Sequence, residues 1–216
     1  MEQMDKLGAD LVKAAEHGTP EQVKRLLEAG APVDTTGPTG LKSYPLLRAA
    51  LRGRTEAMRL LIDHGADLEA KSSGGFTPLL ATALNGYAEA AGLLLDCGAD
   101  IESTGYFGRT ALCKAAYEDH VDLAALLLRR GANPNTTDEE GWTPLMHAVK
   151  NGSAGVFRLL LDHGVDLHVE SEEGETALSI SVICRSWHTI LLKAHMWSRR
   201  RQLVLWASCP QRFQGC

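Results

Sequence analysis

The sequence predicts an all-α protein built from stacked pairs of helices, and three observations lead to this prediction. Glycines recur 33 residues apart from Gly65 to Gly164, and each opens a similar phrase, which reads GADLE, GADIE, GANPN or GVDLH. A second landmark, which reads TPLL, TALC, TPLM and TALS, keeps the same step from Thr77 to Thr176. Between the landmarks, apolar runs are flanked by residues that start and end helices. A fixed step of this size is typical of supersecondary units that stack on one another.

Each unit is expected to begin with a short helix. Thr77 is a good N-cap, and Pro78 suits the first helical position because its missing N–H would have no partner there. The pattern predicts a helix over about residues 78–85, with Leu79 and Ala83 on its apolar face. The same pair recurs two periods later as Thr143 and Pro144.

A longer second helix is expected over about residues 88–97. Its apolar stripe contains Leu93–Leu95, and the same stripe recurs at Leu126–Leu128 and Leu159–Leu161. Gly98 follows at the position where a left-handed residue commonly ends a helix. Neither helix can bury its apolar face alone, so stacking is expected to give each face a neighbour.

The 33-residue step, the TPL phrase and the LLL-x-x-GA-D/N phrase resemble the ankyrin repeat over about residues 8–182. The resemblance implies antiparallel helix pairs with β-hairpin-like finger loops, arranged as an L-shaped, slightly curved solenoid. The expected units are an N-terminal cap at 5–34, repeats at about 35–69, 70–102, 103–135 and 136–168, and a partial repeat at 169–182. Two extra residues are assigned to the loop 35–43.

The chain also departs from the family pattern in two places. The usual histidine after TPL is replaced by Leu47, Leu80, Cys113 and Met146, which leaves the rigidity of the fingers open. From Ile183 the repeat register fails. Three interpretations of residues 183–216 remain open: a degenerate capping repeat, a poorly ordered tail from another exon or reading frame, or a basic module around Arg199–Arg201.

Charge is divided unevenly along the 216 residues. Residues 1–175 hold 16 of the 22 Lys and Arg and all 27 acidic residues, a net charge of −11, whereas the remaining 41 residues carry +6. An acidic body disfavours nucleic-acid binding, which needs basic residues. The five cysteines are irregularly spaced, which argues against a disulfide framework. The first ten residues, MEQMDKLGAD, contain no apolar stretch, and no apolar run reaches the length of a membrane span, so we expect neither a secretory signal nor a membrane helix. We therefore expect a cytoplasmic or nuclear protein.

No catalytic constellation is recognisable in the sequence. Motifs such as G-x-S-x-G, a P-loop or H-E-x-x-H are absent, so we expect no catalytic residue, no cofactor and no metal ion. The tail contains Cys184, His188, His195 and Cys209, but their spacing fits no familiar zinc site. His147, on a first helix, is expected to hydrogen-bond between repeats or to be exposed. The acidic runs 137–141 and 170–175 are read either as solvated finger tips or as a patch for a basic partner.

Positions that vary between units are the expected binding surface. They fall at the finger tips and at the ends of the first helices, which line the concave groove in the ankyrin family. Aromatic and arginine side chains there are the types that dominate interface energies. We expect a monomeric, non-catalytic adaptor, scaffold or inhibitor that binds another protein, one that carries a basic segment if the acidic patch is used. The alternative is the targeting part of a larger or truncated chain whose enzymatic or regulatory domain is missing after residue 182. The expected partner-binding residues are Leu51, Arg52, Phe76, Leu84, Asn85, Tyr106, Phe107, Arg109, Tyr117, Glu118, Trp142, Lys150 and Asn151.

Overall fold

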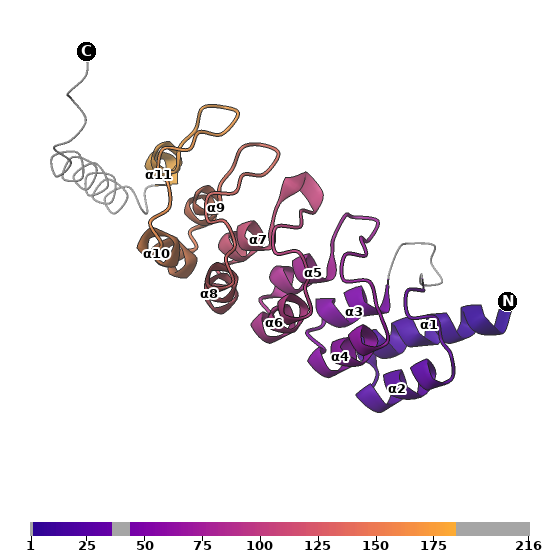
Figure 1. Cartoon of the computed structure of the whole chain (residues 1–216). Helices are drawn as coiled ribbons and strands as arrows, with labels where there is room; N and C mark the ends of the chain where they lie inside the picture. The colour runs from indigo at the N-terminus through magenta and orange to yellow at the C-terminus, as the bar shows by residue number, and fades with distance from the viewer. Residues whose placement is uncertain (1, 36–43, 185–216) are drawn as a thin grey trace, which may run out of the picture.

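The computed structural model describes residues 2–35 and 44–184, and in these ranges the chain forms consecutive helix pairs (Figure 1). The all-α prediction is confirmed. The helices are α1 (Glu2–His17), α2 (Pro20–Glu28), α3 (Pro45–Leu51), α4 (Thr55–Asp63), α5 (Pro78–Asn85), α6 (Ala88–Asp96), the 3-10 turn η1 (Tyr106–Gly108), α7 (Ala111–Glu118), α8 (Val121–Arg129), α9 (Pro144–Asn151), α10 (Ala154–Asp162) and α11 (Ala177–Cys184).

The helices are arranged in two parallel rows. The first helices of the pairs, α1, α3, α5, α7, α9 and α11, contact one another in that order, and α2, α4, α6, α8 and α10 form the second row. The loops before α5, α7, α9 and α11 extend to the same side of the stack (Figure 1). We call these loops fingers and identify each by the five residues at its tip: 72–76, 105–109, 138–142 and 171–175.

Local sequence explains where the helices begin and end. Thr77 caps α5 by accepting a hydrogen bond from Leu80 N at 3.3 Å, and Thr143 caps α9 in the same way. Gly86 ends α5 with a φ of 73°, which costs glycine little because it has no Cβ. Helix α6 ends at Asp96, one residue earlier than predicted, and Gly98 follows it with a φ of 93°.

The core runs without interruption along the stack. Leu94, Leu127 and Leu160 occupy equivalent positions in successive second helices and have no exposed surface. Alanines such as Ala83 and Ala116 allow neighbouring first helices to approach closely. Each unit therefore buries its apolar face against the next, as the repeat pattern predicts.

Hydrogen bonds between loops explain why the GAD-x-E phrase recurs. Asp67 Oδ1 accepts from Glu69 N at 2.9 Å within one unit, and Glu69 Oε1 accepts from Asp100 N of the next unit at 2.8 Å. The same arrangement joins Glu102 Oε1 to Asn133 N at 2.7 Å. The phrase thus fixes each turn and links it to its successor.

Two parts of the predicted organisation lie outside the described residues. The loop 36–43, which contains the two-residue insertion and Ser43, is one of them. Residues 185–216, with His188, His195, Cys209 and the arginine cluster, are the other. The three interpretations of the C-terminal segment and the proposed unit boundaries therefore stay predictions.

Candidate protein-binding site

All the sequence-predicted binding residues lie on what we call the finger face, formed by the four fingers and the C-terminal ends of α3, α5, α7 and α9. The structure brings them into two rows. The finger row holds Phe76, Tyr106, Phe107, Arg109 and Trp142. The helix-end row holds Leu51, Arg52, Leu84, Asn85, Tyr117, Glu118, Lys150 and Asn151. Leu51, Phe76, Leu84, Arg109 and Trp142 are half-buried, and the other eight are exposed.

Several helix-end residues also hold neighbouring units together. Asn85 Nδ2 donates to Leu51 O of the preceding unit at 3.3 Å, and Asn151 Nδ2 donates to Tyr117 O. These bonds help to satisfy carbonyls at helix ends, and the Tyr117 carbonyl also accepts from Ser153 Oγ at 3.0 Å. The amide groups of Asn85 and Asn151 therefore contribute to the fold, whatever else these residues bind.

Arg52 likewise has a partner within the stack. Its Nη2 lies 3.0 Å from Glu16 Oε1 at the end of α1, and Arg48 Nη1 lies 3.5 Å from the other Glu16 oxygen. Glu16 thus ties the first unit to the second, and its one carboxylate is shared between Arg48 and Arg52.

Three of the finger rings, those of Phe76, Phe107 and Trp142, have a basic side chain above them. Lys114 Nζ lies 5.7 Å from the centre of the Phe76 ring, and Lys150 Nζ lies 5.7 Å from that of Trp142. The Arg109 guanidinium lies 5.4 Å from the centre of the Phe107 ring. These distances are in the range of cation–π attraction, so the cations help to orient the rings.

Asp138 is the centre of a buried polar cluster, which corrects its interpretation as part of a solvated acidic run. Its side chain has no exposed surface, and its Oδ2 accepts from His147 Nε2 at 2.8 Å and from Arg109 Nε at 3.2 Å. Its Oδ1 accepts from the backbone N of Trp142 at 2.9 Å and of Glu140 at 3.1 Å. Asp138 therefore fixes the 138–142 finger to α9 and to the preceding finger.

Burial and hydrogen bonding oppose each other in this cluster. Burial alone would raise the pKa of Asp138, but the hydrogen bonds from Trp142 N, His147 and Arg109 outweigh burial and lower the pKa. Burial lowers the pKa of His147 despite its bond to Asp138. His147 is thus neutral near pH 7 and uses the tautomer that donates from Nε2. The prediction for His147 was wrong in both alternatives, because the side chain is buried and its hydrogen-bond partner Asp138 lies in the same unit rather than in a neighbouring one.

Three of the four fingers are closed by a hydrogen bond to the side chain at the first tip position. Ser72 Oγ accepts from Phe76 N at 3.0 Å, and Ser171 Oγ accepts from Glu175 N at 3.1 Å. Asp138 is the equivalent residue one unit before Ser171. This shared position, which the sequence comparison overlooked, was the signal that Asp138 serves the fold.

The 105–109 finger is built differently from the other three. Gly105 stands at the position of Ser72 and Asp138, so no side chain there can accept a hydrogen bond. Phe107 has a φ of 61°, which is an outlier for a bulky residue. Tyr106 and Phe107 are 59% and 43% exposed, and their rings meet edge to face with centres 4.1 Å apart. This finger presents two aromatic rings to solvent.

The repeated geometry agrees with a comparison against known families. Three overlapping segments of the chain, residues 11–105, 83–171 and 112–196, match the family model described as ankyrin repeats in three copies. The chain is an ankyrin-repeat protein. No curated protein sequence matches it. Ankyrin repeats are generally non-catalytic modules for protein–protein interaction, so the chain carries such a module.

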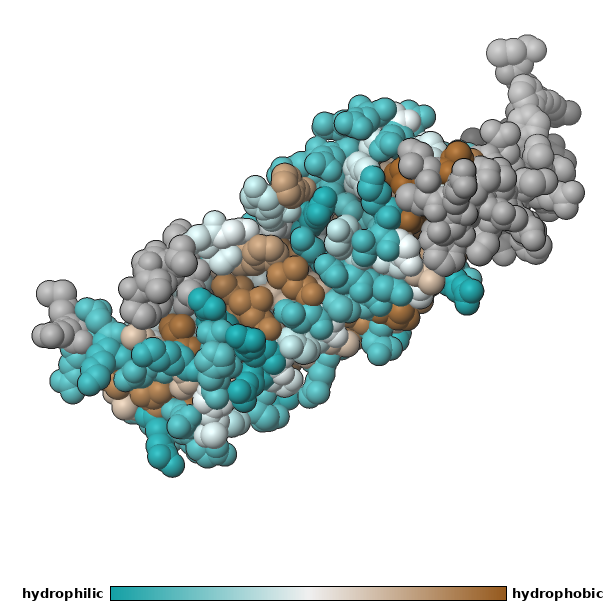
Figure 2. Space-filling view, turned by 180° about the vertical axis from the view of Figure 1, so that it is seen from behind, coloured by the Kyte–Doolittle hydropathy of each residue, from teal (hydrophilic) through white to brown (hydrophobic). Residues whose placement is uncertain are grey.

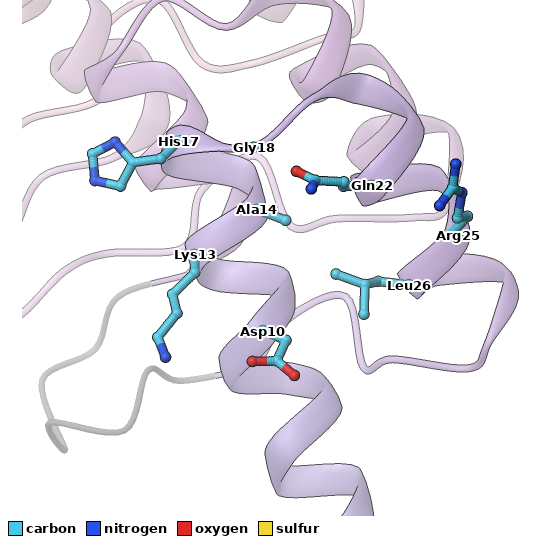
Figure 3. A pocket seen from close by; sticks show the side chains of 8 residues that line it. All are labelled: Asp10, Lys13, Ala14, His17, Gly18, Gln22, Arg25 and Leu26. Carbon is cyan, nitrogen blue, oxygen red and sulfur yellow. The ribbon is translucent and has the colours of Figure 1, made fainter.

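The ankyrin stack has a hollow at its N-terminal end, away from the finger face. It lies between α1 and α2, where Gln22 and Leu26 point toward α1 while Lys13 and His17 point away from α2 (Figure 3). The lining residues are Asp10, Lys13, Ala14, His17, Gly18, Gln22, Arg25 and Leu26. Because the polar groups do not converge, the hollow lacks the arrangement expected of a small-molecule site.

The described residues contain neither a metal site nor a membrane-spanning helix. No group of three or more His, Cys, Asp or Glu residues in residues 2–35 and 44–184 is placed to hold a metal ion. No helix in the part of the chain that the structure describes is long and apolar enough to cross a membrane.

Burial raises the pKa of Cys113 to about 11, so this thiol is not ionised near neutral pH.

The surface of the ankyrin stack is uneven in polarity. Figure 2, which shows the molecule from behind, has a group of hydrophobic residues near the middle of the view, surrounded by hydrophilic residues. Hydrophobic residues gathered in this way commonly mark a place where a protein binds another.

Proposed function

We propose that this ankyrin-repeat protein is a non-catalytic adaptor, scaffold or inhibitor that binds another protein on its finger face, the expected concave side of the stack. The observation that carries the proposal is the gathering of variable aromatic and basic residues on one face while the repeated residues fill the core. Tyr106, Tyr117 and Trp142 are large side chains that remain at least partly accessible there. Such residues contribute strongly when a partner removes them from water.

The proposal also covers the oligomeric state and the cellular location of the protein. We propose that it acts as a monomer in the cytoplasm, with the nucleus as an alternative location. The carboxylates of Glu139, Glu140, Glu172 and Glu173 at two adjacent finger tips favour a partner with a basic segment.

Affinity capture from a cell extract tests the proposal. The wild-type chain is compared with Trp142→Ala and Tyr106→Ala, and captured proteins are quantified by mass spectrometry. We expect both variants to keep most of their thermal stability and to lose the same specific partner. Thermal stability and capture falling together would instead mean that the rings brace neighbouring fingers.

The second candidate function is that of a targeting part of a larger or truncated chain. It is favoured by the abrupt change of composition at residue 183, in the middle of a repeat. Genomic sequence after codon 182 tests it. A continuation of the repeat in another reading frame would support this candidate, and an uninterrupted frame in all transcripts would contradict it.

A further inference from the structure

Three adjacent finger tips form one continuous edge, which we call the fingertip ridge. It consists of Tyr106, Phe107, Glu139, Glu140, Glu172 and Glu173. Glu139 N donates to Phe107 O at 3.0 Å, and Glu172 N donates to Glu140 O at 3.0 Å. Because each tip is hydrogen-bonded to the next, the ridge presents its side chains in a fixed order, with aromatic rings at one end and carboxylates at the other.

The carboxylates of the ridge are unbalanced by the surrounding protein. Glu139, Glu140, Glu172 and Glu173 are exposed, and none takes part in an ion pair found among the described residues. Arg109, the basic residue of the neighbouring finger, is engaged by the buried Asp138. Four negative charges on two joined tips create a local field that attracts cations.

The aromatic end of the ridge is held in a conformation that the fold does not require. Phe107 occupies the same position as Glu140 and Glu173, yet only Phe107 among these has a positive φ. Such backbone strain is concentrated at functional sites. In this conformation Tyr106 and Phe107 are both exposed, with their ring centres 4.1 Å apart.

We propose that the fingertip ridge binds a linear protein segment that combines an apolar side chain with several Lys or Arg residues. The apolar side chain packs against Tyr106 and Phe107, and the basic residues reach the four glutamates. This proposal rests on the proposed function and specifies the partner. The charge of the ridge argues against nucleic acid, whose phosphates it would repel. A second copy of this acidic body is disfavoured for the same reason.

The test is selection from a random twelve-residue peptide library displayed on phage, with the full chain as bait. Selected peptides are then synthesised and their Kd values measured by fluorescence anisotropy at low and high salt. We expect enrichment of peptides with at least two basic residues and one aromatic or aliphatic residue, and weaker binding at high salt.

Two ridge variants make the test specific. Replacing all four glutamates by glutamine should weaken binding at least about fourfold, because exposed ion pairs contribute about 0.2–1 kcal/mol each. Tyr106→Ala combined with Phe107→Gly should weaken it about 30-fold, as for a hot spot. Thermal unfolding of both variants should stay near that of the wild type. The matched control, Glu56→Gln, Asp63→Asn, Glu89→Gln and Asp162→Asn, changes the same charge in the second-helix row and should bind normally.

The outcomes separate this proposal from the proposed function. Binding that is weakened by Lys150→Glu but not by the ridge variants would overturn the ridge proposal and leave finger-face binding intact. Binding insensitive to both would overturn both. Failure to select any peptide, or enrichment of peptides without basic residues, would overturn the ridge proposal alone. Selection that succeeds only after Arg199–Arg201 are replaced by serine would overturn it too, because the occupant would then be this chain's own C-terminal segment.

Discussion

Phe107 and Asp119 are the two residues in the described part of the chain that adopt a positive φ without being glycine, and their surroundings differ. Asp119, with a φ of 58° at the end of α7, accepts hydrogen bonds from Val156 N at 2.9 Å and Gly155 N at 3.4 Å. It thereby caps α10 of the next unit, whose own N-cap residue Ser153 makes no capping bond. Phe107, with a φ of 61°, places its ring at the solvent-exposed finger tip. The same unfavourable backbone thus serves folding at one site and, we propose, binding at the other.

The largest expected loss of stability is at the 138–142 finger, where the finger-tip residue Asp138 stabilises the fold. Asp138→Ala removes the acceptor for His147 and Arg109 and leaves both groups without it. We expect it to lower the free energy of unfolding by about 3 kcal/mol. Urea denaturation measures the change. Glu139→Ala, one residue further on and exposed, is the control and should change stability by less than about 0.5 kcal/mol.

The next effect concerns Asp119 itself. Asp119→Ala removes the cap of α10 and places a less tolerant residue at a positive φ, so the free energy of unfolding should fall by about 2 kcal/mol. Asp119→Asn keeps an acceptor and tolerates the backbone, and should cost less than about 0.5 kcal/mol. Equal stability of the alanine and asparagine variants would mean that the cap contributes nothing.

The stability contributed by the buried pair His147 and Asp138 should also depend on pH. His147 has a folded pKa below its ordinary value, so the unfolded chain takes up a proton that the folded chain does not as pH falls below about 6.5. Stability should therefore decrease on acidification, by up to about 1.4 kcal/mol per pH unit from this residue. Asp138, with a lowered pKa, should cause a further loss only below about pH 4. Urea denaturation at several pH values from 7.5 to 5 should show that the free energy of unfolding decreases less with acidification in His147→Gln than in the wild type. The same pH dependence in both proteins would contradict a contribution of His147.

The sequence predicted the repeated part of the structure well because each repeated residue has a local reason. Thr77 caps a helix, Gly98 adopts a left-handed backbone, and Leu94 is buried, and all three roles follow from the residue type and its place in the period. The expected partner-binding residues were also predicted to share one face, because they occupy equivalent positions in successive repeats, and in the structure they all lie on the finger face. Whether those residues bind a partner is a question for the experiments above.

The sequence did not reveal the roles of residues that depend on contacts between separate segments or on the local backbone conformation. Asp138 looked like one of several solvated acids, because its contacts with Arg109 and His147 come from different segments. Asp119 stands where Gly86 and Gly152 end the equivalent helices, and nothing in its own repeat shows that it caps a helix 36–37 residues further along the chain. Phe107 could be placed at a finger tip, but its backbone strain depends on the turn that its own finger adopts.

The most direct test compares Asp119→Gly with Phe107→Gly in the full chain, because glycine relieves a positive φ at both sites. Unfolding free energy and capture of the partner found with the wild type are measured side by side. We expect Asp119→Gly to lose about 1 kcal/mol of stability and to bind normally, since only the cap is lost. Phe107→Gly should keep its stability, or gain up to about 1 kcal/mol, and bind poorly. A Phe107→Gly protein that is destabilised, or that captures the partner as well as the wild type, would contradict the account.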